Sequence, residues 1–190
     1  SYPGITMYGF TGAGGPNIVE RNLVWHTMDN GIQVVGQIVV RNNIVLDAAV
    51  AGIDSKPSQN TVPTNVTIQD NTVAGPGSCL HANNWSTEID QAVENNALYC
   101  PAGDAINIVG GAGNGATITT NIGLGNSTVA TGFTQGTSAA TDLGDPSTGA
   151  VYPPPGSALI GAAGGAQPVD DFNASPRTHQ DVGEYYVAGP

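Results

Sequence analysis

Apolar and polar residues alternate along this chain in short segments that recur at a nearly constant interval. Five segments align on an asparagine, and a β-branched aliphatic residue stands three positions before each one. The asparagines are Asn22, Asn43, Asn71, Asn96 and Asn121, and the β-branched residues are Val19, Val40, Ile68, Val93 and Ile118. Alternation over a few residues is typical of a half-buried strand. The pattern therefore predicts a repeated strand whose β-branched residues form one inward column.

A second short strand lies in the intervals. Its lead residues are Ile5, Ile32, Ile53, Leu80 and Ile106. Two interleaved strands that share a period of roughly 25 residues, with no helix between them, predict coils of an all-β, right-handed parallel β-helix of about five coils. Coils stacked ~4.8 Å apart would join the aliphatic columns into one core. The asparagines would form a structural ladder at a turn, where asparagine tolerates left-handed backbone geometry, and a polar ligand track is the alternative interpretation.

The pattern lapses after residue 125. Residues 126–168 are rich in Gly, Ser, Thr, Ala and Pro, and we expect them to run as loop along the solenoid. The tail ends in the strand-like piece Glu184-Tyr-Tyr-Val187. We therefore divide the chain into the β-helix coils, residues 1–125, and a loop-rich C-terminal segment that packs on them, residues 126–190.

Composition and charge narrow the functional classes. The chain has 27 Gly and 13 Pro, which disfavours long helices. Only four residues are Lys or Arg, against fifteen Asp or Glu, and the net charge is −11. Nucleic-acid binding needs clustered cations, so we do not expect it. No apolar run reaches the ~18 residues of a membrane span. Cys79 and Cys100 form no metal-binding motif, and we expect a disulfide between them if the protein is secreted.

Three C-terminal stretches carry a resemblance to a known superfamily. They read Pro155-Gly-Ser-Ala-Leu-Ile-Gly-Ala-Ala163, Asp171-Phe-Asn-Ala-Ser-Pro-Arg177 and Asp181-Val-Gly-Glu-Tyr-Tyr186. With the coils, they resemble secreted bacterial right-handed β-helix proteins of the pectate-lyase-like superfamily, many of which end in PGSPAIGAG, DFDGxPR and DIGAYEY motifs. The resemblance implies an extracellular or cell-surface protein associated with polysaccharide. It also makes Ca²⁺ a candidate cofactor, because enzymes of the superfamily often hold Ca²⁺ with clustered carboxylates.

Strand alternation allows the outward face of the second strand to be read from the sequence. One outward column is Thr6, Gln33, Asp54, His81 and Asn107, and the next is Tyr8, Val35, Lys56, Asn83 and Val109. Asp54, His81 and Lys56 are the candidate catalytic residues, because a carboxylate, an imidazole and an amine on one face can abstract a proton beside a uronate carboxylate. Gln33, Asn83, Asn107 and Tyr8 are the candidate saccharide-binding residues. The alternative is a set of ordinary solvated side chains.

Other candidate sites are simpler. Arg41 beside Glu20 is expected to form an ion pair across two coils. His26 with Asp29 supplies two ligands for a metal, which is too few for a site. Acidic residues that offer oxygen ligands for Ca²⁺ gather late in the chain, at Asp142, Asp145, Asp170, Asp171 and Asp181.

Three functions stay open. The chain is a lyase-like or epimerase-like protein that processes an acidic or a plant or microbial polysaccharide, a saccharide-binding module without chemistry, or a structural surface or filament subunit. The third follows from the expected N-terminal end, where the coil containing Ile5, Met7 and Ile18 has no preceding coil to cover it. We expect another chain, missing upstream coils or the folded-back 126–168 segment to cover that end.

Overall fold

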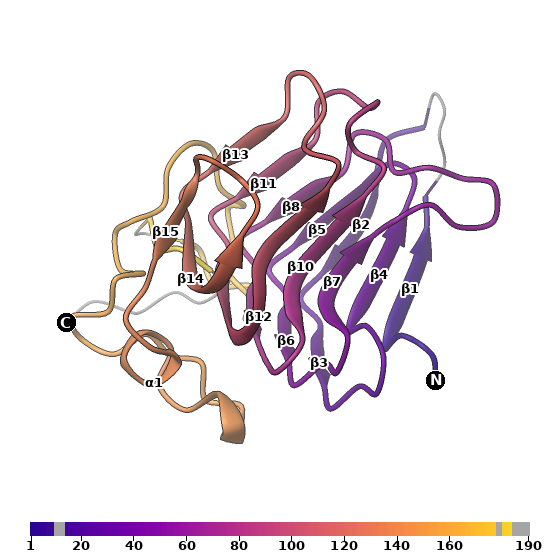
Figure 1. Cartoon of the computed structure of the whole chain (residues 1–190). Helices are drawn as coiled ribbons and strands as arrows, with labels where there is room; N and C mark the ends of the chain where they lie inside the picture. Colours follow the sequence, from indigo (N-terminus) through magenta and orange to yellow (C-terminus); the bar gives the residue numbers. More distant parts are fainter. Residues whose placement is uncertain (10–13, 178–179, 184–190) are drawn as a thin grey trace.

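The computed structural model describes residues 1–9, 14–177 and 180–183, and it shows a parallel β-helix of about five coils (Figure 1). Each coil contributes a strand to each of three rows. The first row contains β1 (Ile5–Tyr8), β4 (Ile32–Val35), β7 (Ala51–Ser55), β10 (Ser78–Asn83) and the end of β12 (Ala97–Val109). The second row contains β2 (Asn17–Glu20), β5 (Ile38–Arg41), β8 (Thr67–Gln69), β11 (Ala92–Glu94) and β13 (Thr117–Thr119). The third row contains β3 (Leu23–Trp25), β6 (Ile44–Leu46), β9 (Thr72–Ala74), the start of β12 and β14 (Asn121–Ser127).

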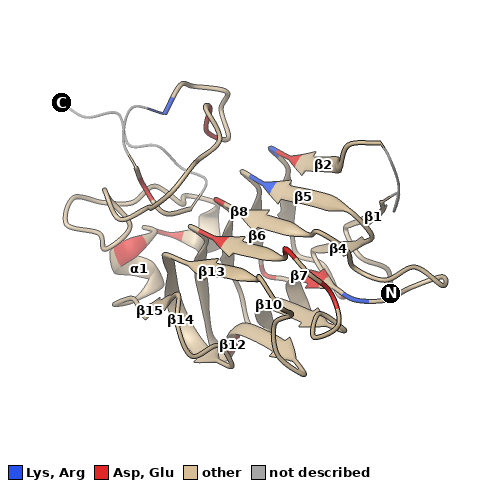
Figure 2. Cartoon of the chain, turned by 90° about the horizontal axis from the view of Figure 1, so that it is seen from above, with Lys and Arg blue, Asp and Glu red and all other residues tan. Residues whose placement is uncertain are grey.

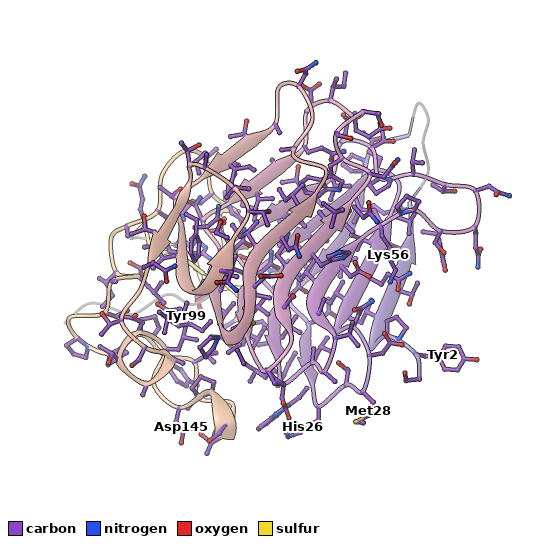
Figure 3. All side chains as sticks on the ribbon, viewed as in Figure 1. Tyr2, His26, Met28, Lys56, Tyr99 and Asp145 are labelled. Atoms are coloured by element: carbon purple, nitrogen blue, oxygen red, sulfur yellow. A yellow bond between two sulfur atoms is a disulfide. The ribbon has the colours of Figure 1, made fainter. Side chains whose placement is uncertain are left out.

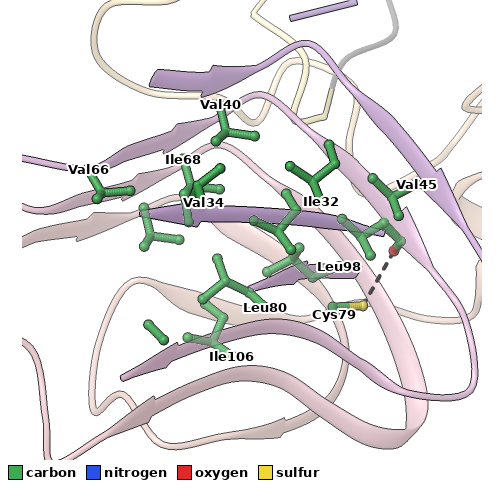
Figure 4. Packing of buried hydrophobic residues seen from close by; sticks show 14 of the residues in the cluster. Ile32, Val34, Val40, Val45, Val66, Ile68, Cys79, Leu80, Leu98 and Ile106 are labelled. Atoms are coloured by element: carbon green, nitrogen blue, oxygen red, sulfur yellow. Dashed lines mark hydrogen bonds between the residues drawn. The ribbon is translucent and has the colours of Figure 1, made fainter. Parts of the chain in front are cut away.

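The predicted inward column is confirmed. Its five residues are paired in register from coil to coil along the second row. Val40, Ile68 and Val93 are completely buried, whereas Ile118 at the last coil is partly buried against the same core. Figure 4 shows Val40 and Ile68 facing Ile32 and Leu80 from the first row across the interior. Side chains of all three rows therefore share one apolar core.

The asparagines form the predicted structural ladder. The side-chain amides of Asn22, Asn43, Asn71 and Asn96 each donate to the Oδ1 of the asparagine on the next coil, at 2.9 or 3.0 Å, and Asn121 is the last acceptor. The expected left-handed geometry, however, lies one residue earlier. At these five corners the residue with positive φ is the one before the asparagine, namely Arg21, Asn42, Asp70, Asn95 or Thr120. The preceding residue therefore turns the chain at each corner, and the asparagine's contribution is its amide hydrogen bonds.

A disulfide joins Cys79 of β10 to Cys100 of β12, with the Cα atoms 5.6 Å apart, as predicted. It links successive coils inside the apolar core, where the two cysteines are buried beside Leu98. The bond closes a loop with a sequence separation of 21 residues, which is about one coil.

The C-terminal segment contains more structure than the predicted loop. It adds β15 (Phe133–Gln135), which pairs in parallel with the start of β14, the short helix α1 (Ala139–Asp142) and the 3₁₀ turn η1 (Pro146–Thr148). The segment covers the outer face of the third row. Leu143, Val151 and Leu159 are buried there against Leu46 and Tyr99, so the third row is apolar on both faces. The piece Glu184-Tyr-Tyr-Val187 lies outside the described residues.

The residues with positive φ that precede the ladder asparagines form a column, and two of them bind the last part of the C-terminal segment. Asn42 Nδ2 donates to the Asp170 carbonyl oxygen at 2.8 Å, and Asn95 Nδ2 donates to that of Gly164 at 2.9 Å. Figure 1 shows β15 and α1 at the end of the solenoid remote from β1, whereas Pro146 and Ser147 reach back along the third row to Trp25 of the first coil. Among the described residues, no helix is long and apolar enough to cross a membrane.

Candidate functional site

The first row presents the predicted outward column in register across five coils. Pairing along the row runs through Thr6, Gln33, Asp54, His81 and Asn107. Parallel strands keep equivalent residues ~4.8 Å apart, so side chains on neighbouring coils can bond directly. The column therefore places Asp54 of β7 next to His81 of β10, as the alternation predicted.

Asp54 is the centre of a cluster of hydrogen-bond donors. Its Oδ1 lies 2.8 Å from His81 Nδ1, and its Oδ2 lies 2.6 Å from Lys56 Nζ and 2.7 Å from Asn30 Nδ2. The Asp54 side chain is only 2% exposed although it points outward, whereas those of His81 and Lys56 are 30% and 39% exposed. The donors thus cover the carboxylate and leave their own outer edges accessible.

The environment keeps Asp54 ionised. Burial would raise the pKa of its carboxyl group, but the bonds from His81 and Lys56 outweigh burial and hold the pKa below its ordinary value. An ionised carboxylate only accepts hydrogen bonds, so His81 Nδ1 carries the proton. In the neutral imidazole the lone pair is then on Nε2, the other ring nitrogen. A buried carboxylate that orients an imidazole in this way prepares it to accept a proton.

The remaining predicted face residues lie around this cluster. Gln33 Oε1 accepts a bond from Asn30 Nδ2 at 3.3 Å, and Asn107 Nδ2 donates to Asp104 Oδ2 at 2.8 Å. The Tyr8 hydroxyl lies 3.5 Å from Ser58 Oγ, and Asn83 is exposed at the end of β10.

One residue of the second outward column, which contains Tyr8 and Lys56, is not available to a ligand. Val35 is completely buried, although its position in the strand directs it outward. The Thr64 backbone N–H donates to the Gly36 carbonyl oxygen at 3.2 Å, which brings the loop after β7 back to this end of the row. Alternation predicts the direction of a side chain, but it does not predict what a loop covers.

Sequence reasoning missed Asn30. It is nearly completely buried, it bonds to both Asp54 and Gln33, and its Oδ1 has no hydrogen-bond partner. Asn30 lies in the turn before β4, so no strand alternation assigns it to a face. The Asn30-Gly31 dipeptide signals a turn, but it does not indicate that the amide reaches the next coil.

The second row carries the predicted ion pair. Arg41 Nε lies 2.7 Å from Glu20 Oε2, and Arg21 Nη2 lies 3.0 Å from Glu20 Oε1. The pair lowers the pKa of Glu20, chiefly through the hydrogen bond from Arg41. Figure 2 shows these cations side by side at the ends of β2 and β5. Each charge is balanced by a neighbour, which agrees with a structural role.

The residues that were candidate metal ligands do not lie together in the structure. His26 Nδ1 pairs with Asp47 Oδ2 of the next coil at 2.5 Å, and not with Asp29 as the turn spacing suggested. The late carboxylates accept local bonds instead: Asp171 Oδ1 from the Ser175 N–H and Asp181 Oδ1 from the Gly161 N–H. In the part of the chain that the structure describes, no three His, Cys, Asp or Glu side chains lie close enough together to hold a metal ion.

Three cavities of the described residues lie away from this face. They measure about 340, 200 and 310 Å³, and Asp54, His81 and Lys56 line none of the three. The first opens onto the core near Ile108, the second lies beside Arg41, and the third adjoins His26. A groove bordered by the candidate catalytic residues was expected, and these cavities do not supply one.

Comparison with known proteins supports the fold. Residues 8–98 match the family described as "Right handed beta helix region". The match includes Asp54, Lys56 and His81 and ends before the C-terminal segment. No curated protein and no solved structure matches the chain. The chain is thus a right-handed β-helix protein.

Proposed function

We propose that this protein is an extracellular member of the pectate-lyase-like β-helix proteins that binds a polysaccharide on the outer face of its first row. The observation that carries the proposal is the cluster of donors around the buried Asp54 carboxylate, which fixes His81 and Lys56 in place at the surface. The disulfide between Cys79 and Cys100 supports the location, because such bonds persist in oxidising compartments.

The repeat of the face suits a polymer. Gln33, His81 and Asn107 occupy one column, so polar groups recur at the coil spacing of ~4.8 Å along the solenoid axis. An extended polysaccharide presents hydroxyl groups at regular intervals, and each can exchange bonds with an amide or imidazole. The polar groups are already positioned, which reduces the entropy lost on binding.

The charge of the face favours a neutral polymer. Lys56 is paired with Asp54 at 2.6 Å, and the carboxylate of Asp104 lies beside Asn107. No unpaired cation among these face residues awaits a uronate carboxylate, and the net charge of −11 repels a polyanion at long range. Figure 2 shows how few Lys and Arg residues offset the acidic ones.

A second candidate function is proton abstraction by His81. The bond of 2.8 Å from Nδ1 to Asp54 favours it, because it leaves the Nε2 lone pair free to act as a base. On a uronate, Nε2 would take the proton beside the carboxylate, the electron pair would form the new ring double bond, and the glycosidic C–O bond at the adjacent carbon would break. The departing oxygen would take a proton from the His81 imidazolium.

Binding assays with matched variants test the proposal. Affinity electrophoresis against neutral polysaccharides and polyuronates should show retardation by a neutral polymer. His81→Ala and Gln33→Ala should each weaken binding about three- to tenfold, since each removes one or two hydrogen bonds. Gln135→Ala, an exposed amide on β15, should bind like wild type. Equal retardation of all four proteins, or none by any polymer, would refute the proposal.

The catalytic version has its own assay. Elimination from a polyuronate creates a conjugated double bond that absorbs ultraviolet light. Absorbance that grows with wild type and is lost in His81→Ala supports a lyase. Binding without any such absorbance leaves a saccharide-binding module.

An assembling subunit is favoured by a different observation. Within the described ranges, β1, β2 and β3 pair on one side only, and Ile18 and Leu23 are about half exposed on these edge strands. A second copy that stacked on this end would bury them and pair their backbone groups. Sedimentation of this chain over a wide concentration range tests the idea, and a strict monomer would contradict it.

A further inference from the structure

We propose that the cavity between the third row and η1 is a second ligand site, and that it binds a single neutral pyranose ring. The cavity measures about 310 Å³ and lies outside the Asp54 cluster. Figure 3 shows the separation: Lys56 lies on the first row, whereas His26 lies at the lower edge of the molecule on the same side as Asp145. Known ligand pockets span ~300–1,000 Å³, so this one suits one sugar ring.

The cavity is formed by two parts of the chain that are distant in sequence. Trp25, Leu46 and Ala74 end successive strands of the third row and are paired in register. Pro146 and Ser147 of the C-terminal segment close the other side. The apolar wall of Trp25, Leu46 and Pro146 matches the face of a pyranose, which carries C–H groups.

Polar groups stand on the same wall. His26 Nδ1 lies 2.5 Å from Asp47 Oδ2, and the imidazole stacks on the Trp25 indole with ring centroids 4.9 Å apart and an interplanar angle of 20°. Stacking and the bond to Asp47 fix the ring, so the exposed edge of the pair is preorganised to bond with hydroxyl groups.

Gly75 lines the cavity close to the backbone of the adjacent coil. His26, Asp47 and Gly75 follow the strand ends Trp25, Leu46 and Ala74, so they occupy one column. His26 and Asp47 have φ of 54° each, whereas Gly75 does not have a positive φ. The φ angle therefore does not require glycine at this position, and the restriction comes from the close approach of the adjacent coil. A Cβ atom there would lie 3.3 Å from both Cα and N of Asp47, so a side chain would press on the backbone that carries the Asp47 carboxylate in the cavity wall.

The charge and bonding of the lining restrict the ligand. Asp47 contributes a carboxylate to the lining, and the Ser147 hydroxyl donates to Asp145 Oδ1 at 2.6 Å. No Lys or Arg lines the cavity, so a neutral sugar is favoured over a uronate. The Ser147 hydroxyl donates its proton to Asp145 and can still accept a hydrogen bond from a sugar hydroxyl.

Tryptophan fluorescence reports on this cavity directly. The chain has two tryptophans, and Trp85 is completely buried with its Nε1–H donated to Ser55. A ligand that enters the cavity should therefore change the emission of Trp25 and reduce its quenching by acrylamide. Methyl glucoside, methyl galactoside and methyl mannoside are the neutral probes. Methyl glucuronide is the matched probe that differs from methyl glucoside by one carboxylate.

Variants distinguish this site from the Asp54 cluster. We expect a saturable change with at least one neutral probe, and at least fivefold weaker binding of methyl glucuronide than of methyl glucoside if glucoside is the ligand. Asp47→Ala and Gly75→Val should each weaken the neutral probe at least tenfold, whereas His81→Ala should leave it unchanged. Urea midpoints check that both variants fold. If one of them does not fold, Ser147→Ala, at the exposed rim of the cavity, replaces it.

The outcomes are separable from those of the polysaccharide assay. Absence of a saturable change with all neutral probes would overturn the proposal, as would wild-type affinity in Asp47→Ala and Gly75→Val. Loss of the fluorescence change in His81→Ala would also overturn it, because the ligand would then bind at the first row. None of these results decides whether a polymer binds beside Asp54.

Discussion

The hydrogen-bonded ladder of asparagines should contribute much of the stability of the solenoid, and Asn71 in its middle tests this. Its Nδ2 donates to the carbonyl oxygens of Val40 and Gln69 at 2.9 and 3.0 Å, and to Asn96 Oδ1 at 3.0 Å. Its Oδ1 accepts from the backbone N–H and the Nδ2 of Asn43 at 3.1 and 2.9 Å. Asn71→Ala removes all five bonds from a site that is completely buried.

The cost follows from the groups left without partners. Each buried donor or acceptor that loses its partner costs ~1–3 kcal/mol, and the Asn43 N–H and Val40 carbonyl cannot reach water. We therefore expect Asn71→Ala to lower the free energy of unfolding by about 3–5 kcal/mol. Single domains are stable by ~5–15 kcal/mol, so the variant should remain folded but be much weakened.

Asn22→Ala is the matched control. Asn22 makes the same type of bonds, to the Glu20 carbonyl oxygen at 3.0 Å and to Asn43 Oδ1 at 2.9 Å, but it lies at the partly exposed end of the ladder. Water can replace its bonds, so the loss should be ~1 kcal/mol. Urea unfolding with an unchanged m-value measures both variants. A difference below ~1 kcal/mol between them would refute the reasoning.

Three further predictions concern stability. Ile68→Ala leaves a cavity in the central column and should cost ~2–5 kcal/mol, measured by urea unfolding. Replacing both Cys79 and Cys100 by Ser should cost ~3 kcal/mol, because the unfolded chain regains the freedom of one coil; an unchanged midpoint would contradict this. Burial raises the pKa of Asp70 to about 7, so the folded state keeps a proton that the unfolded state loses. The contribution of Asp70 to stability should then be full below pH ~4 and fall between pH ~4 and ~7 by up to ~1.4 kcal/mol per pH unit, and Asp70→Asn should remove this part of the pH dependence.

The coils could be predicted from the sequence because several columns of recurring residues indicate the same strand register. A shift of one residue in that register would have moved Ile68 from the core to the surface, so the strict recurrence of aliphatic residues is compatible with one register only. The contact of Asp54 with His81 followed from the same register. The burial of Asp54 did not, because it depends on Asn30, which lies in a turn outside the alternation.

The C-terminal packing was harder to predict, although one signal was present. The strand Ile44–Leu46 is apolar at every position, which is typical of a strand covered on both faces. The sequence does not indicate which distant segment covers the outer face, because Leu143 and Leu159 are isolated in a region rich in Gly and Pro. The cavity beside Trp25 exists only where these two parts meet.

The central claim is that a polysaccharide binds at His81, and imidazole nuclear magnetic resonance tests it most directly. The chain has three histidines, which can be assigned with single substitutions. Adding neutral oligosaccharides of increasing length should shift the His81 Nε2 signal with a saturating curve, and the effect should strengthen with length because several coils contribute contacts. Binding that saturates while the His81 signals stay unchanged would contradict the account.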